Sequence, residues 1–408
     1  MRKIRLLHLL IAPLLVLPLL NGCGGRAREA PPEETITVPD EYAALYRELD
    51  SKLGEIESDI SRQWDGSKFG TKFSTELLAA ESNRGEALLR EQTLASVKRN
   101  LDALVSLGVG AVTLSINYPI LDSQFPHSSQ YLDFYRKVAA EIKSRGLAMI
   151  VETTTIFPNP DFSSLNVNYA GLTLERYKQG KRAMDQTILE ELKPDYLTVE
   201  NESSTQRANT GLDFSVKNQT EIVQYILDGL NRGATRIGAG AGTWDNLAYF
   251  ESLARNTSID YLDMHIYPIG DAMVMDAATR IADLAGANKK GLTINEAWLY
   301  KIGSNESAGI PGAESKYFAR DAYGFWSPLD EKFLTVMVKL SHYLRLEFMS
   351  PFWMIYFYAY ADYDSATSKL DYPGLQRLVD TQAAPNILSG TLSPTGLAYR
   401  DLIAGNGI

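Results

Sequence analysis

The chain has few of the residues that build disulfides and metal sites. Its 408 residues include four histidines and one cysteine, Cys23. A single cysteine cannot form a disulfide within the chain, so the fold must rely on its apolar core. Of the histidines, only His127, His265 and His342 lie beyond the first 22 residues, and no two are close in sequence. We therefore expect no zinc site.

The chain also lacks an excess of basic residues. It has 40 Lys and Arg against 50 Asp and Glu, a formal net charge of −10. Binding to nucleic acid normally uses a basic surface, so no nucleic-acid partner is expected. The glycine run at 238–242 has neither the Lys-Ser/Thr of a phosphate-binding loop nor the spacing of a dinucleotide fingerprint, and no G-x-S-x-G elbow occurs. We expect no cofactor and, as oligomeric state, a monomer.

No hydrophobic run is long and regular enough to be a convincing membrane-spanning helix. The N-terminus instead has a basic start, MRKIR, and a proline-broken apolar stretch that ends in LNGC. These features resemble a bacterial lipoprotein signal, which implies a signal peptide over 1–22 and a lipid anchor on Cys23. Gly24 after the cysteine favours the outer membrane, facing the periplasm or the surface. The alternative is a cleaved secretory signal with an incidental cysteine.

The remaining chain divides into a tether and one domain. Residues 23–40 are polar and rich in Gly, Pro and Glu, which is typical of a flexible tether. Residues 41–408 form the domain, which starts with apolar residues at helical spacing over 41–64. Eight apolar runs follow: FGTKFSTELL, GAVTLSINY, LAMIVETTT, YLTVENE, RIGAGAG, YLDMHIY, LTINEAW and PFWMIYFYAY.

Helical patterns separate these runs, at 92–107, 130–145, 174–192, 219–232, 246–255, 273–287 and 332–346, and a last helix follows Thr391. Left-handed helix exits are expected at Gly108, Gly146, Gly233 and Gly291. Runs that are apolar throughout fit parallel strands buried on both faces. The fold class is therefore α/β, and eight strand–helix units predict a (β/α)8 barrel with an extra N-terminal helix. An open doubly wound sheet is the alternative.

Polar and aromatic side chains gather where these strands end. In a (β/α)8 barrel the functional residues lie at the C-terminal ends of the strands, so we expect the following residues to share one barrel mouth. They are Asn117, Asn201, Glu202, Trp244, His265, Tyr267, Glu296 and Trp298, and Glu76, Glu152 and Glu200 also lie at strand ends without an assigned role. Two carboxylates are the catalytic groups of most glycoside hydrolases. The faces of aromatic side chains stack on sugar rings.

The pair Asn201-Glu202 ending the fourth run and Glu296 ending the seventh resemble the clan A glycoside hydrolases. The fourth run is most similar to that of the family 53 endo-β-1,4-galactanases. The resemblance implies that Glu202 is the acid/base, Asn201 binds the sugar 2-hydroxyl, and Glu296 is the nucleophile. His265 and Tyr267 match the aromatic residues that flank the nucleophile. The second run lacks the arginine common in the clan, which leaves the exact family and substrate open.

Each site residue also has a structural explanation. Glu202 could cap a helix, Glu296 could belong to a rim ion pair, and His265 or Trp298 could be part of the core. Glu200 competes with Glu202, because residues two apart face the same way in a strand. We prefer Glu202, which requires the turn to break that alternation. In a retaining enzyme the two carboxyl groups lie about 5–5.5 Å apart, and such proximity should raise the pKa of the group that acts as the acid.

The sequence thus predicts a lipid-anchored, retaining glycosidase that cleaves a β-linked oligo- or polysaccharide. The first alternative is a catalytically inactive barrel lipoprotein that only binds glycans. The second is a solute-binding lipoprotein of a transporter, which needs two lobes and is disfavoured by eight barrel units. Sugar, linkage and endo or exo action do not follow from the sequence.

Overall fold

A computed structural model describes residues 36–267, 274–306 and 314–405. The described chain contains one eight-stranded parallel sheet with the order β1-β8-β7-β6-β5-β4-β3-β2. The strands are β1 (Lys72–Phe73), β2 (Ala111–Ser115), β3 (Ala148–Glu152), β4 (Tyr196–Thr198), β5 (Arg236–Gly242), β6 (Tyr261–Ile266), β7 (Gly291–Ala297) and β8 (Phe348–Pro351).

The sheet curls into a nearly closed barrel. Phe73 pairs with Met349 of β8 on one side of β1. On its other side the contact with β2 is made by single backbone bonds, from Gly110 N to Phe73 O (2.9 Å) and from Thr113 N to Thr75 O (3.1 Å). A parallel bridge between Glu76 and Thr113 completes this seam. The predicted (β/α)8 barrel is confirmed, and the open sheet is excluded for the described residues.

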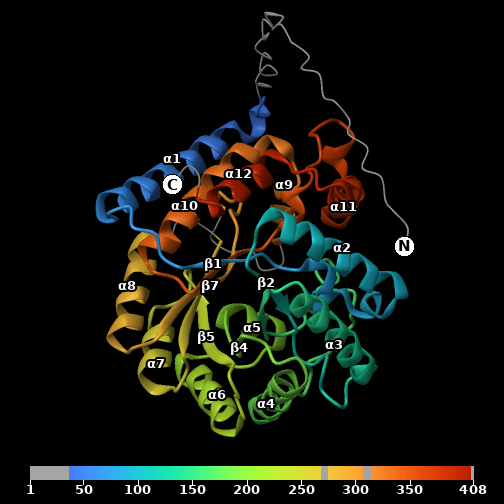
Figure 1. The fold of residues 1–408 in the computed structure, drawn as a ribbon, viewed down its shortest axis with the longest axis vertical. Coiled ribbons are helices and arrows are strands. Elements are labelled where there is room, and N and C mark those ends of the chain that lie inside the picture. Colours follow the sequence, from blue (N-terminus) through green and yellow to red (C-terminus); the bar gives the residue numbers. More distant parts are fainter. Residues whose placement is uncertain (1–35, 268–273, 307–313, 406–408) are drawn as a thin grey trace, which may run out of the picture. The chain divides into compact units, whose positions relative to one another are not determined.

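Helices connect the strands and surround them (Figure 1). They are α1 (Ala43–Gln63), α2 (Glu91–Leu107), α3 (Ser128–Ser144), α4 (Leu174–Glu191), α5 (Ser203–Thr210), α6 (Val216–Gly229), α7 (Ala248–Asn256), α8 (Val274–Ala287), α9 (Glu314–Asp321), α10 (Ser327–Tyr343), α11 (Tyr372–Ser389) and α12 (Pro394–Ile403). All the predicted helices are present, including the N-terminal α1. Helices α5, α9 and α11 were not predicted, because each is short or lacks a strong apolar period.

Three of the four glycines expected at helix exits have the left-handed conformation: Gly108, Gly146 and Gly233. The expectation for Gly291 was wrong. Gly291 is the first residue of β7, and Lys289 takes the left-handed conformation two residues earlier, with φ 56°. A lysine can adopt this conformation at a modest cost, so the turn did not need a glycine.

The barrel interior is layered along its axis. A small apolar cluster fills one layer, and its members are Ala111, Ile150, Tyr196, Tyr261 and Phe348. Hydroxyl and amide groups form the next layer: Thr198 Oγ1 lies 2.9 Å from the Tyr261 hydroxyl and accepts a bond from Asn295 Nδ2 at 3.2 Å. Because these polar groups form hydrogen bonds with one another inside the barrel, they hold the neighbouring C-terminal strand ends in fixed positions.

The predicted signal peptide at 1–22, Cys23 and residues 24–35 of the predicted tether lie outside the described residues. Among the residues that the structure describes, no helix combines the length and apolar character needed to cross a bilayer.

Candidate active site

The chain changes direction directly after β4, and this change positions Glu202. Strand β4 ends at Thr198, and Glu202 has a left-handed backbone with φ 42° and ψ 60° just before α5. A left-handed non-glycine residue carries a conformational cost that the surrounding structure must offset, and such residues concentrate at functional sites. As a result Asn201 and Glu202 both reach His265 of β6. The turn therefore breaks the strand alternation, as the assignment of Glu202 required.

A bulge in β7 positions Glu296. Met264 of β6 pairs with Ile294, but the next residue, His265, pairs with Glu296, so Asn295 is the extra residue. A bulge bends its strand and turns the following side chains. Asn295 consequently points into the barrel toward Thr198, while Glu296 lies beside His265 at the mouth.

His265 links the two candidate carboxylates. Its Nδ1 lies 2.7 Å from Glu202 Oε1 and 3.5 Å from Glu296 Oε2. The two carboxylates therefore meet at the same imidazole nitrogen. The Tyr267 hydroxyl donates a 2.6 Å bond to Glu296 Oε2. The predicted residues Glu202, His265, Tyr267 and Glu296 thus form one cluster.

Two more carboxylates lie deeper beside His265. Its Nε2 is 3.3 Å from Asp263 Oδ2 and 3.5 Å from Glu152 Oε1. The side chains of Glu152 and Asp263 are 2% and 0% exposed, whereas those of Glu202 and Glu296 are 15% and 13% exposed. Of these four carboxylates, those of Glu202 and Glu296 are therefore the more open to solvent. Asn201 Nδ2 donates to Glu152 and lies 3.1 Å from His265 Nε2, which locks the amide in place.

This crowding changes the pKa values of the cluster. Burial, followed by the charge of Glu152, raises the pKa of Glu296 well above its usual range. Burial alone would lower the pKa of His265, but the carboxylates of Glu152 and Glu296 raise it well above 6.5. A raised pKa, which we expected of the acid, is thus found at Glu296, and burial is its largest cause.

Glu200 belongs to a different environment. It is fully buried behind the sheet, where the Tyr177 hydroxyl of α4 donates a 2.5 Å bond to its Oε1 and Lys181 Nζ lies 3.8 Å away. Lys181 also donates to Thr153 Oγ1 at 2.7 Å. These contacts make Glu200 part of a buried structural network between β4 and α4, so it does not compete with Glu202 for the mouth.

The remaining predicted residues, Trp244, Asn117 and Trp298, differ in how deeply they are buried. Trp244 is half-buried beside the Tyr267 ring, with centroids 6.0 Å apart. Asn117 is buried, and its Oδ1 accepts bonds from the backbone and hydroxyl of Thr154. Trp298 is 0% exposed and packs against Tyr356 and Phe357. The structure therefore places Trp298 in the core, without a free face for a sugar.

Two residues at the mouth were not given a site role from the sequence. Tyr300 packs on Tyr267 with ring centroids 4.6 Å apart, and the charges of Glu202 and Glu296 add to burial in raising its pKa. Burial raises the pKa of Asp245 to about 6, and the neighbouring Glu202 contributes. Asp245 directly follows Trp244 and was visible in the sequence as a polar residue after the fifth run. Tyr300 lies two residues after Trp298, and a wider window after the seventh run would have found it.

Glu152, His265 and Glu296 also have ligand atoms within 4.8 Å of one another, a spacing that a metal ion could use. Both ring nitrogens of His265 already have close partners, Glu202 at Nδ1 and Asn201 at Nε2. A metal ion would have to displace one of them, so this geometry does not favour a metal.

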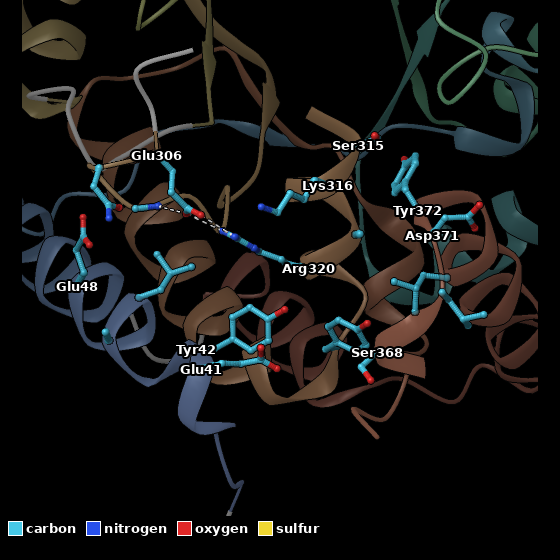
Figure 2. A pocket seen from close by; sticks show the side chains of 18 residues that line it. Glu41, Tyr42, Glu48, Glu306, Ser315, Lys316, Arg320, Ser368, Asp371 and Tyr372 are labelled. Atoms are coloured by element: carbon cyan, nitrogen blue, oxygen red, sulfur yellow. Dashed lines mark hydrogen bonds and ion pairs between the residues drawn. The ribbon is translucent and has the colours of Figure 1, made fainter. Parts of the chain in front are cut away.

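A cavity of about 770 Å³ lies elsewhere, between α1, α9 and the residues around Tyr372 (Figure 2). None of the carboxylates around His265 lines it. Its main charged pair is structural: Arg320 donates to both carboxylate oxygens of Glu306 at 2.7 and 2.8 Å. Because Glu202, Glu296 and His265 come together at the barrel mouth and do not line this cavity, we place the candidate chemistry at the mouth.

No protein-family model matches the chain, and no curated protein sequence matches it. Solved structures do. One is a variant of a GH5_18 protein from Bifidobacterium longum subsp. longum in complex with Manβ1-4GlcNAc, at 13% identity and TM-score 0.52, covering 82% of this chain and 78% of that one. Another is a β-glucosidase from Thermotoga maritima in complex with glucoimidazole, at 11% identity and TM-score 0.51, covering 84% and 100%. At such identities the likeness shows the shared barrel fold.

Proposed function

We propose that this chain is a retaining glycoside hydrolase of clan A that cleaves a β-linked oligo- or polysaccharide. The observation that carries the proposal is the approach of Glu202 and Glu296 to the same nitrogen of His265, at the ends of β4 and β7. They are also the two partly exposed carboxylates of that cluster. The barrel that the chain shares with the GH5_18 protein and the β-glucosidase supports the same class. A specificity like that of family 53 stays a prediction.

In the proposed mechanism Glu296 attacks the anomeric carbon while Glu202 protonates the leaving oxygen. The Tyr267 hydroxyl holds Glu296 Oε2 in position and favours its ionised form. Glu202 then removes a proton from the incoming water, which releases the sugar from Glu296. In this proposal Asn201 binds the sugar 2-hydroxyl, and the half-buried Trp244 offers a ring on which a sugar can stack. No cofactor takes part.

One observation favours the alternative of an inactive glycan-binding barrel. Burial and the charge of Glu152 raise the pKa of Glu296, which disfavours the ionised form that a nucleophile must have. No arginine or lysine among the described residues forms an ion pair with it. The two functions therefore differ in one measurable property, turnover.

The test compares two substitutions. Glu296→Ala should abolish hydrolysis of every glycoside, because no covalent intermediate can form. Glu202→Ala should retain activity on aryl glycosides whose leaving group needs no proton, and azide should restore its rate. Glu200→Gln is the control, since Glu200 lies behind the sheet and should not show the azide effect. An azide-rescued Glu200 variant would reassign the acid, and an inactive wild type that still binds glycans would establish the binding protein.

We also propose that the domain is tethered to a bacterial membrane through a lipid on Cys23. The basic start, the apolar stretch and LNGC support this proposal.

A further inference from the structure

The mouth has an unusual charge balance. Four carboxylates, those of Glu152, Glu202, Asp263 and Glu296, lie within 3.5 Å of the nitrogens of His265. The buried carboxylate of Glu76 adds a further negative charge, which raises the pKa of Glu296. Within residues 36–267, 274–306 and 314–405, no lysine or arginine pairs with any of these five. One imidazolium therefore faces five acidic groups.

Several polar atoms of this cluster have no partner. Glu76 Oε2 and Glu152 Oε2 are buried acceptors without a hydrogen bond, and the contact that Asp263 Oδ2 makes with His265 Nε2 is 3.3 Å long. Asn201 is 0% exposed, its Nδ2 is committed to Glu152, and its Oδ1 has no partner either. What the cluster still lacks is thus hydrogen-bond donors and positive charge. Protons can supply part of this charge, but a protonated Glu296 cannot act as a nucleophile.

We propose that the substrate itself supplies the missing charge, as an ammonium group on the reacting sugar. The substrate class is then a β-glycoside of an unacetylated amino sugar, with its amine on the carbon next to the anomeric centre. This inference rests on the proposed function, in which Asn201 contacts that carbon's substituent. An ammonium group there donates to Asn201 Oδ1 and lies beside Glu296, where it favours the ionised nucleophile.

The geometry favours an organic cation over a metal ion. A metal at Glu152, His265 and Glu296 would replace a contact of His265 and occupy the nucleophile's oxygen. An ammonium group needs only acceptors at hydrogen-bond distance and leaves both contacts of His265 intact. Glycosides that carry a carboxylate, in contrast, meet repulsion from the carboxylates of this cluster.

The test uses matched 4-nitrophenyl β-glycosides of glucosamine, N-acetylglucosamine, glucose and glucuronic acid, and of galactosamine and galactose. We expect kcat/KM for the amino sugar to exceed that of the hydroxyl analogue by roughly tenfold or more, with the glucuronide poorest. An equal or better rate on the neutral sugars would overturn the proposal. If the preference disappears with a chelator and returns with zinc, the cation is a metal and the proposal also fails.

Calorimetric binding of the methyl β-glycosides of glucosamine and glucose separates this inference from the proposed function. A chain that prefers the methyl glucosaminide but hydrolyses nothing would retain the cation site and refute the glycosidase. A chain that hydrolyses neutral glycosides without any preference for an ammonium group would be a glycosidase without the cation site.

Glu152→Gln removes one buried charge while its amide oxygen can still accept from Asn201. This variant should lose most of the preference for the amino sugar, a fall of about tenfold in the ratio of the two kcat/KM values. Glu48→Gln is the matched control, because Glu48 lines the cavity of Figure 2 and not the mouth. An unchanged ratio in folded Glu152→Gln overturns the proposed role of this charge, and the wild-type panel decides the proposal if the variant does not fold.

Discussion

At the scale of single residues, the hydroxyl of Tyr267 has the clearest expected effect on the chemistry. It donates to Glu296 Oε2 at 2.6 Å, and burial, then the charge of Glu296, keeps its own pKa well above 10. It therefore remains a donor at all working pH values. A hydrogen bond to the charged form of a carboxyl lowers that carboxyl's pKa.

Tyr267→Phe should consequently reduce kcat by roughly ten- to a hundredfold, as expected for a lost bond to a charged group. Because the pKa of Glu296 rises further without this donor, the acidic limb of the kcat/KM profile should move to higher pH. The other charged or titratable groups facing Glu296 are His265, Glu152, Glu202 and Glu76, and all remain in the variant.

Tyr300→Phe is the control for this prediction. Tyr300 packs on Tyr267 but makes no hydrogen bond to Glu296 in the described structure. A similar shift of the acidic limb in this variant would show that general polarity, and not the Tyr267 bond, sets the pKa.

At the scale of elements, the alternating glycines of β5 make room for their neighbours. A Cβ at Gly240 would lie 1.8 Å from the backbone oxygen of Asp263, and one at Gly242 would lie 2.3 Å from the Trp244 ring. The first contact is with backbone, which cannot move without disturbing β6, whereas a tryptophan ring can turn.

Gly240→Ala should therefore destabilise the barrel by several kcal/mol, on the scale of other severe core changes. Gly242→Ala should fold but displace Trp244, which raises KM with a smaller effect on kcat. Thermal unfolding and Michaelis kinetics of the two variants check this distinction. Equal loss of stability in both would show that Trp244 is as fixed as the β6 backbone.

The contact between β4 and α4 predicts a pH dependence of stability. Burial raises the pKa of Glu200 from 4.5 to about 7. Between these values the unfolded chain loses this proton and the folded chain keeps it, so the contribution is complete below about pH 4.5 and is lost as the pH rises to about 7.

Wild type should therefore lose more unfolding free energy between pH 4.5 and 7.5 than Glu200→Gln, by on the order of 2 kcal/mol. Urea unfolding of both proteins at the two pH values measures the difference. If the unfolding free energies of the two proteins change equally between these pH values, Glu200 is ionised in the folded state over the whole range, held by Lys181.

How far the sequence predicted these elements depends on the kind of signal. The strands and most helices follow from apolar periodicity, and the residues after β4, β6 and β7 follow from strand ends. The separation of Glu200 from Glu202 needed the left-handed turn, and the position of Glu296 needed the bulge at Asn295. Neither has a sequence signature. Trp298 and Tyr300 could not be told apart, because only packing decides which aromatic ring remains open.

At the scale of the whole molecule, the N-terminal sequence predicts where the domain is held. Wild type should fractionate with membranes, whereas Cys23→Ser should appear in the soluble fraction, since no lipid can attach to serine. Immunoblots of both fractions measure this. Equal membrane association of the two proteins would refute the lipid anchor. Activity per molecule should be the same for both, because Cys23 lies outside the barrel domain.

The contact between the start of the barrel and the last helix has a consequence for how the protein is made. The Tyr399 hydroxyl of α12 donates a 2.8 Å bond to Ser74 O, which lies 325 positions earlier, beside β1. A ribosome delivers β1 long before α12, so β1 must wait until nearly the whole chain has been synthesised. Until then the barrel cannot close. The predicted export signal at 1–22 would act on the chain in this state, in which it can still be threaded through a translocation pore.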